Sequence, residues 1–166
     1  CFAILAPYVL PALLAAVEKE LPGLEVEPVE EPLDGIQTGL TEGRFELALT
    51  YDLALSEAIE TRPLRQIRPH ALLAASHPLS SAESVHLADL ADEPFVLLDM
   101  PHSRDYFRLA FTDAGVQPHI RYRTRSAETA RALVARGLGW SLLNLRPTNN
   151  QSVEGRRVVA RELADP

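Results

Sequence analysis

The sequence contains a single cysteine, Cys1, among its 166 residues. One thiol cannot form a disulfide within the chain, so folding does not require an oxidising compartment. Long hydrophobic runs are also missing, because no apolar stretch approaches the roughly 18 residues that a membrane-spanning helix needs. We therefore expect no membrane association. The 46% hydrophobic and 23% charged residues are typical of one globular domain or of two small lobes.

Positive charge is scarce as well. Sixteen Lys and Arg residues against 23 Asp and Glu residues give a formal net charge of −7. Binding to a nucleic acid duplex requires clustered cations that neutralise phosphates. We therefore expect that no nucleic acid binds to the surface of this chain.

Known catalytic motifs are missing too. No segment matches the phosphate-binding loop, the dinucleotide-binding glycine pattern, the nucleophile elbow or a helical pair of metal-binding histidines. The histidines are not spaced as metal ligands are; they are His70, His77, His86, His102 and His119. We expect neither catalysis nor a metal or other cofactor.

Helix-like and strand-like patterns alternate along the chain. Apolar residues recur at helical spacing in four segments, which are 7–21, 33–43, 103–114 and 127–136, and a short helix is predicted from Ser84 or Val85 to Leu90. Strand-like segments are 24–27, 45–51, 70–76, 95–99, 119–125 and 140–145, with a last one from Val158. This alternation, with short links, predicts an α/β fold with a mostly parallel sheet.

Two predicted strand-to-helix junctions carry polar residues. His102 and Ser103 follow the strand that ends at Asp99, and Arg125 and Ser126 precede the helix 127–136. Ligands of open α/β sheets bind beyond the carboxyl ends of the strands, and helix N-termini favour anions. The pattern therefore predicts that Ser103, Arg125 and Ser126 converge on a small carboxylate, with His102 beside them.

Plainer interpretations remain open for the same residues. The two serines are also typical helix N-caps, and His102 is equally compatible with an exposed loop. Arg121, Arg123 and Arg125 alternate along one strand, so they are expected on one face that water alone can solvate. The sequence does not decide between capping and ligand binding.

Six short motifs occur together in an order and at a spacing typical of one known family. They are Ala6–Pro11, Pro22–Val26, Leu40–Leu49, Ala75–Leu79, Leu87–Leu90 and Leu133–Gly139. On these motifs the chain resembles the effector-binding domain of LysR-type bacterial transcriptional regulators, over essentially its whole length. The resemblance implies a two-lobe fold like that of type 2 periplasmic binding proteins. Residues 1–66 would form part of lobe one and residues 67–166 lobe two, with both ends of the domain truncated.

The same resemblance implies the partners and the site of action. It implies a small-molecule effector in the cleft between the lobes, a homodimer or homotetramer, and a cytoplasmic protein. DNA would be bound only through an N-terminal helix-turn-helix domain that this sequence does not contain. Effector binding would reorient the lobes and shift a pre-existing equilibrium of the oligomer.

One departure from the family concerns the first lobe. The polar Ser or Thr that often contacts the effector in the family falls near Ile4 in this sequence. We therefore expect Ile4, Leu5 and Ala6 to offer apolar contacts and backbone N–H groups only. A ligand with an apolar body and an acidic head, such as a small organic or aromatic carboxylate, fits this expectation better than a sugar does.

Two other functions share the same fold and stay open at this point. One is a solute-binding protein of a transporter, which an upstream signal peptide would favour and an upstream helix-turn-helix would exclude. The other is an enzyme such as an amino-acid dehydratase or a tetrapyrrole synthase. An enzyme would need a convergent acid, base or nucleophile set, and the sequence shows none.

Overall fold

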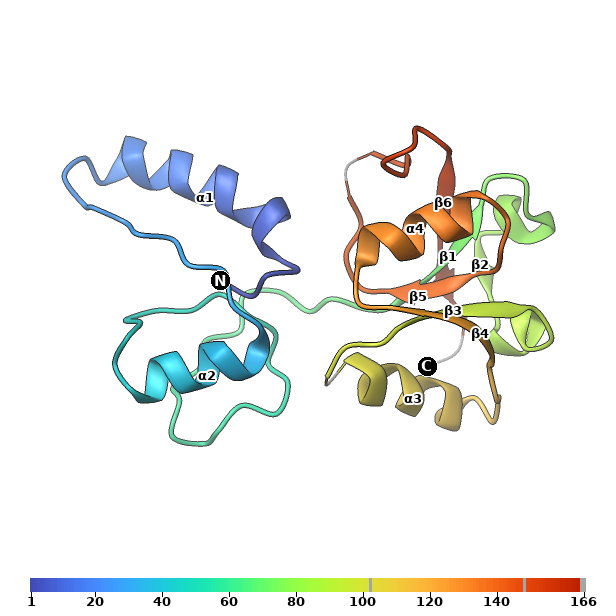
Figure 1. The fold of residues 1–166 in the computed structure, drawn as a ribbon, viewed down its shortest axis with the longest axis horizontal. Helices are drawn as coiled ribbons and strands as arrows, with labels where there is room; N and C mark the ends of the chain where they lie inside the picture. Colours follow the sequence, from blue (N-terminus) through green and yellow to red (C-terminus); the bar gives the residue numbers. More distant parts are fainter. Residues whose placement is uncertain (102, 148, 165–166) are drawn as a thin grey trace. The chain divides into compact units, whose positions relative to one another are not determined.

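The computed structural model describes residues 1–101, 103–147 and 149–164, and the chain divides into two compact units (Figure 1). The first unit is Cys1–Gln66 and the second is Ile67–Pro166. No helix in the described parts of the chain is both long and apolar enough to cross a membrane.

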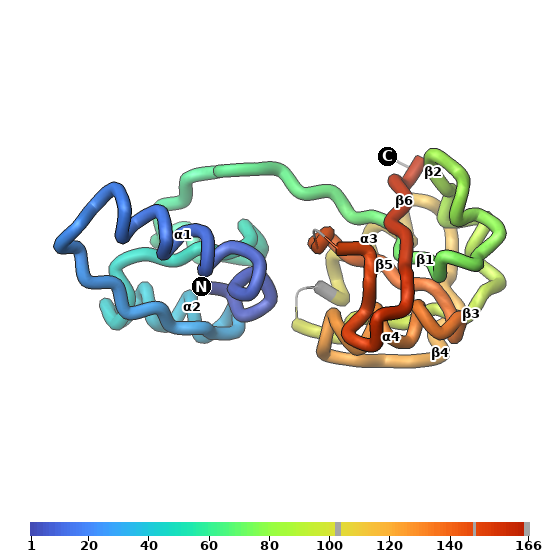
Figure 2. The backbone as a smooth tube through the Cα atoms, turned by 90° about the horizontal axis from the view of Figure 1, so that it is seen from above, coloured from blue at the N-terminus to red at the C-terminus, as the bar shows by residue number. Residues whose placement is uncertain are grey.

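The first unit holds two helices, α1 (Ala6–Glu20) and α2 (Leu33–Thr41) (Figures 1 and 2). A proline in the first turn starts α1, since proline lacks an N–H that this turn leaves unpaired anyway. Helix α2 buries Leu33, Ile36 and Gly39. Both helices were predicted from their apolar spacing, and both predictions are confirmed.

The remainder of the first unit is held by single backbone hydrogen bonds between extended segments. The N–H of Phe2 donates to the carbonyl of Leu49 at 2.9 Å, and that of Ala3 donates to the carbonyl of Glu31 at 3.0 Å. The strands predicted at 24–27 and 45–51 do not form, and those predictions were wrong. Apolar alternation favours a strand only where a partner strand pairs along its length, and here the pairing is limited to isolated contacts.

The second unit contains a four-stranded sheet, in the order β2-β6-β1-β5. Its strands are β1 (His70–Ala74), β2 (Ser84–Val85), β5 (Ser141–Leu143) and β6 (Val158–Leu163). Strand β1 lies antiparallel to both β5 and β6, whereas β2 is parallel to β6. The α/β prediction is confirmed, but the expected mostly parallel arrangement is wrong for this sheet. Helix–strand alternation does not fix the direction in which the late strands return to β1.

A second, two-stranded sheet pairs β3 (Pro94–Leu98) with β4 (His119–Thr124) in parallel. Each strand is followed by a helix, α3 (Ser103–Asp113) after β3 and α4 (Ala127–Ala135) after β4. Short 3-10 helices span Pro78–Ser81 and Leu87–Leu90. The short helix predicted from Ser84 is therefore displaced, because Ser84 and Val85 pair with β6 instead.

An aromatic cluster at Trp140 joins the two sheets. The ring of Phe95 lies 4.7 Å from that of Trp140 and 5.1 Å from that of Phe111, measured between centroids. The indole N–H of Trp140 donates to the carbonyl of Leu90 at 3.0 Å, which satisfies its one polar group. Backbone bonds between Trp140 and β3 run in both directions, so the chain contacts the two-stranded sheet at Trp140 and then enters the four-stranded sheet as β5.

Candidate ligand-binding site

The carboxyl ends of β3 and β4 lie next to each other. Leu98 and Thr124 are register partners, and the N–H of Asp99 donates to the carbonyl of Thr124 at 2.7 Å. Because the two strands are parallel, α3 and α4 both begin at this edge (Figure 1). The edge therefore combines two strand ends with two helix N-termini, the arrangement that binds ligands in open α/β sheets.

Asp99 occupies the centre of this edge and holds two guanidinium groups. Its Oδ1 lies 3.1 Å from Nε of Arg104, and its Oδ2 lies 3.3 Å from Nη1 of Arg123. One carboxylate thus faces two cations, and the cluster keeps one uncompensated positive charge. Both arginine side chains are 54% exposed, so water screens much of that charge.

Arg125 directly follows β4 and is exposed. Across residues 1–101, 103–147 and 149–164, no hydrogen bond or ion pair engages its guanidinium. The guanidinium remains charged at any physiological pH and presents donors in a planar fork that matches a carboxylate. Arg125 therefore adds a second available positive charge to the edge.

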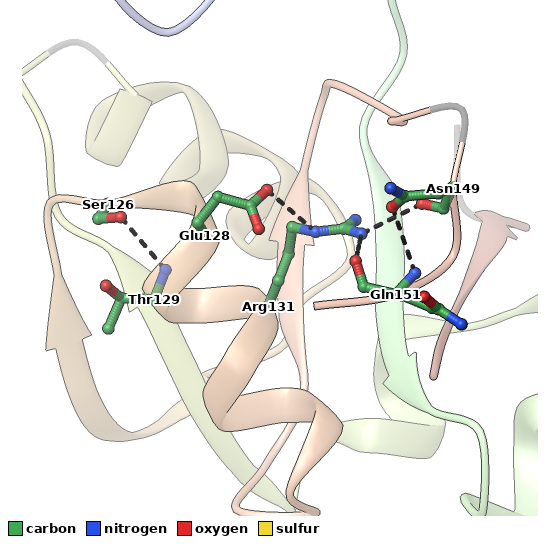
Figure 3. Close-up of polar contacts among 6 residues, drawn as sticks. All are labelled: Ser126, Glu128, Thr129, Arg131, Asn149 and Gln151. Carbon is green, nitrogen blue, oxygen red and sulfur yellow. Dashed lines mark hydrogen bonds and ion pairs between the residues drawn. The ribbon is translucent and has the colours of Figure 1, made fainter. Parts of the chain in front are cut away.

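Ser126 caps α4, as one of the two interpretations of the sequence predicted. Its Oγ accepts a hydrogen bond from the N–H of Thr129 at 3.2 Å (Figure 3). Its own N–H donates to Oγ1 of Thr124 at 3.1 Å. Capping uses a lone pair of the hydroxyl and leaves its proton free to donate. The cap and a ligand contact are therefore compatible at Ser126.

One turn into α4, Glu128 and Arg131 fix the helix to the loop that precedes β6 (Figure 3). Nε of Arg131 lies 3.2 Å from Oε1 of Glu128. Nη2 of the same guanidinium donates to the carbonyls of Asn149 and Gln151, at 3.2 and 2.7 Å. Arg131 is buried, and the sequence analysis did not single it out. The sequence did contain a signal for its burial, because Arg131 lies in an otherwise apolar stripe of the helix.

His102 and Ser103, and Ile4, Leu5 and Ala6 of the first unit, were also predicted as site residues. His102 is outside the described residues, and Ser103 forms the start of α3. In the first unit Ile4 lies in a turn and is half-buried, whereas the side chains of Leu5 and Ala6 are buried. The N–H groups of Leu5 and Ala6 donate to the carbonyl of Phe2 at 2.8 and 3.1 Å, so both backbone donors already have a partner.

Metal chemistry has no support in the described part of the chain. No group of three or more His, Cys, Asp or Glu side chains there is arranged to hold a metal ion. The polar groups at the β3–β4 edge are mostly cationic or hydroxyl donors. Such a donor set suits an anion and not a metal.

Comparison with known proteins identifies the family of the chain that carries this edge. The family model described as "LysR substrate binding domain" matches residues 1–166. The "Probable hydrogen peroxide-inducible genes activator" of Mycobacterium leprae is 32% identical over 163 residues, covering 93% of this chain and 50% of that protein.

Solved structures agree with the sequence comparison. HinK, a LysR family transcriptional regulator from Pseudomonas aeruginosa, is 40% identical with a TM-score of 0.95, over 100% of this chain and 58% of that one. The BenM effector binding domain with its effector benzoate is 28% identical with a TM-score of 0.79, over 99% and 75% of the two chains.

The chain belongs to the LysR substrate binding domain family, whose members are transcriptional regulators. The resemblance drawn from the six motifs is thereby confirmed, as is the periplasmic-binding-protein-like α/β fold. The chain spans about half the length of the curated relatives that it matches.

Proposed function

We propose that this chain is the effector-sensing module of a LysR-type regulator, and that its effector is a small organic carboxylate bound at the carboxyl ends of β3 and β4. The exposed guanidinium of Arg125, with no partner in the described residues, carries this proposal. It stands directly before the N-terminus of α4, where backbone N–H groups and the helix dipole favour a negative charge.

The groups around Arg125 match a carboxylate head in charge and in hydrogen-bond donors. Arg125 can bind it in bidentate fashion, the hydroxyl of Ser126 can donate one further hydrogen bond, and the Asp99 cluster contributes a net positive charge. A sugar would leave these cations without a counter-charge. An inorganic anion would not use the apolar contacts that we propose for Ile4, in place of the hydroxyl common in the family.

The benzoate effector of BenM supports this ligand class, because benzoate joins an apolar ring to one carboxylate. We further propose that residues 1–66 and 67–166 act as the two lobes of the effector domain. The complete protein would bind DNA through another domain, assemble as a homodimer or homotetramer and act in the cytoplasm. Within it, effector binding would favour one of two arrangements of the oligomer.

The test is a titration of carboxylates against the complete protein that contains this chain. Benzoate and other small carboxylates are compared with their amides, such as benzamide, by calorimetry in chloride-free buffer. We expect carboxylates to bind and amides not to bind. Removing one charge-assisted hydrogen bond in Arg125→Ala should weaken binding by about 1.5–3 kcal/mol, or about one to two decades in Kd.

Arg108→Ala provides the matched control, since Arg108 is an exposed arginine of α3. This variant should keep the wild-type affinity. If Arg125→Ala also binds the carboxylate with full affinity, the anion contact is assigned to the wrong residue. Ile4→Ser should weaken ligands with apolar bodies more than it weakens acetate, and an equal effect on both would contradict the role given to Ile4.

A further inference from the structure

A small cavity lies in the second unit, away from the β3–β4 edge. It has a volume of about 30 Å³, is lined by β1, α4, β6 and the loop after β5, and opens to solvent. Its polar lining comes from His70, Arg131, Arg146 and Asn150, and the other lining residues are apolar. A space of this size exceeds the roughly 10–15 Å³ needed for one water, and it is too small for an aromatic acid.

Two buried side chains present unpaired nitrogen atoms in this region. His70 is only 1% exposed, and its Nδ1 is buried without a hydrogen-bond partner among the described residues. Arg131 is 3% exposed, and its Nη2 donates to the carbonyls of Asn149 and Gln151. Nε lies 3.2 Å from Oε1 of Glu128 but makes no hydrogen bond with any described residue. Buried polar atoms of native proteins are nearly always paired, so these atoms indicate a missing occupant.

The buried side of the cavity is positively charged, because Arg131 lies there. The guanidinium of Arg131 is buried, whereas its partner Glu128 is 39% exposed. Arg146 pairs with Glu162 through Nη2 and Oε1 at 2.7 Å, and the side chain of Glu162 is 57% exposed. Both carboxylates are therefore screened by water more strongly than the buried cation is.

The pKa of the His70 imidazole reflects first its burial and then the two neighbouring arginines. Burial, together with the positive charges of Arg146 and Arg131, lowers the pKa of His70 from 6.5 to about 3. His70 is thus neutral at physiological pH, and with its proton on Nδ1 it is a donor. The positive charges of Arg146 and Arg131, the smaller of these causes, also disfavour a cation in the cavity.

We propose that this cavity binds a small monovalent anion, a halide such as chloride, held by Arg131, Arg146 and His70. The available groups are donors of hydrogen bonds, and the volume fits one halide ion. Arg146, with its side chain 44% exposed, gives the ion a route from solvent. The site is separate from the proposed effector site, because it opens beside β1 and β6 and not at the carboxyl ends of β3 and β4.

The experiment compares sodium chloride with sodium isethionate at equal ionic strength, using the complete protein without effector. Isethionate is too large for the cavity and is not a carboxylate, so it serves as the inert salt. We expect chloride, and bromide in its place, to raise Tm in a saturable manner. Chlorine NMR should show excess line broadening that bromide abolishes, and the nitrogen NMR signals of the His70 ring should shift over the same chloride range.

Two variants separate this cavity from other anion sites. Arg146→Gln keeps a polar side chain at the mouth of the cavity and should weaken the chloride effect at least ten-fold. Arg108→Gln removes an exposed cation of α3 and should leave the effect unchanged. Identical melting curves in chloride and isethionate, without excess line broadening, would show a water-filled cavity and overturn the proposal. An undiminished chloride effect in Arg146→Gln would also overturn it.

Because the effector titration is performed without chloride, the two proposals fail separately. A carboxylate that binds normally while chloride has no effect rejects only the halide site. Chloride binding without any carboxylate binding rejects only the proposed effector. We expect chloride not to compete with benzoate, since a cavity of about 30 Å³ does not admit an aromatic ring.

Discussion

The guanidinium of Arg131 lies 3.2 Å from the carboxylate of Glu128, one turn earlier on α4. The same guanidinium donates to the carbonyls of Asn149 and Gln151 (Figure 3). A single buried side chain thus holds the first turns of α4 against the loop between β5 and β6. Because both carbonyls rely on Arg131 as a donor, its loss affects more than one ion pair.

Replacing Arg131 by methionine should therefore destabilise the second unit. The substitution keeps the apolar stem and leaves the two loop carbonyls without their donor. We expect a loss of about 2–4 kcal/mol in the free energy of unfolding, because the substitution removes two hydrogen bonds from a charged group and one ion pair. Urea unfolding followed by the fluorescence of Trp140, the chain's single tryptophan, measures it. Arg136→Met, which breaks the exposed pair with Glu154, is the control and should change nothing measurable.

The stability of the second unit should depend on the titration of His70. Its pKa is about 3 in the folded chain and 6.5 in the unfolded chain. The unfolded state therefore binds the proton first as the pH falls, and stability decreases with falling pH between about 6.5 and 3. The slope for one such group is about 1.4 kcal/mol per pH unit. The groups that face His70 are Arg131, Arg146 and Glu162.

Urea unfolding from pH 7 to pH 5 in chloride-free buffer tests this slope. His70→Gln should show a shallower dependence on pH than the wild type, because glutamine does not titrate. Carboxylates titrate in both proteins and cancel in the difference. Equal slopes for the two proteins would mean that His70 has an ordinary pKa in the folded state.

Position 139 requires a glycine for two reasons, which are its backbone conformation and its close contact with Pro94. Its φ is +151°, and a Cβ at this position would overlap the carbonyl group of Pro94. Gly139→Ala should therefore push β5 away from β3 and cost more than about 3 kcal/mol. Gly155→Ala is the matched control, with φ of +75° and nothing near its Cβ, and should cost about 1 kcal/mol. Equal losses would show that the contact with Pro94 is not limiting.

Peroxide should not switch this chain through an internal disulfide. Cys1 is the single cysteine, so the chain offers no resolving thiol, although several relatives are named as hydrogen peroxide-inducible genes activators. Cys1→Ser in the complete protein should leave the response of the regulator unchanged. Reporter assays with and without peroxide measure this, and a response lost in Cys1→Ser alone would refute the prediction.

The helices were predictable because their signals are local. Apolar spacing placed α1, α2, α3 and α4, and Ser126 was identified as the cap of α4. The strands of the first unit were mispredicted because pairing depends on distant segments. Leu47 is 87% exposed although it lies in the most apolar run of that unit. Apolar composition alone did not distinguish a buried strand from a segment that lacks a partner.

The candidate site was predictable only in part. Arg125 and Ser126 were located from the junction that follows β4. The pairing of Asp99 with Arg104 and Arg123 was not, because a register shift between Phe95 and Val96 sets which residues of β3 and β4 face each other. The cavity at His70 was beyond prediction as well. Its lining comes from elements separated by dozens of residues, and only the folded sheet brings them together.

The position of β1 also determines when the second unit can fold during synthesis. His70 pairs with Leu143 on one side and with Glu162 on the other, so both neighbours of β1 are translated long after it. Until those segments leave the ribosome, the buried strand Ala71–Ala74 has two open edges and no sheet to join. A nascent chain arrested before β6 should therefore depend on chaperones and be sensitive to proteases, whereas release of the last strand should protect the whole unit at once.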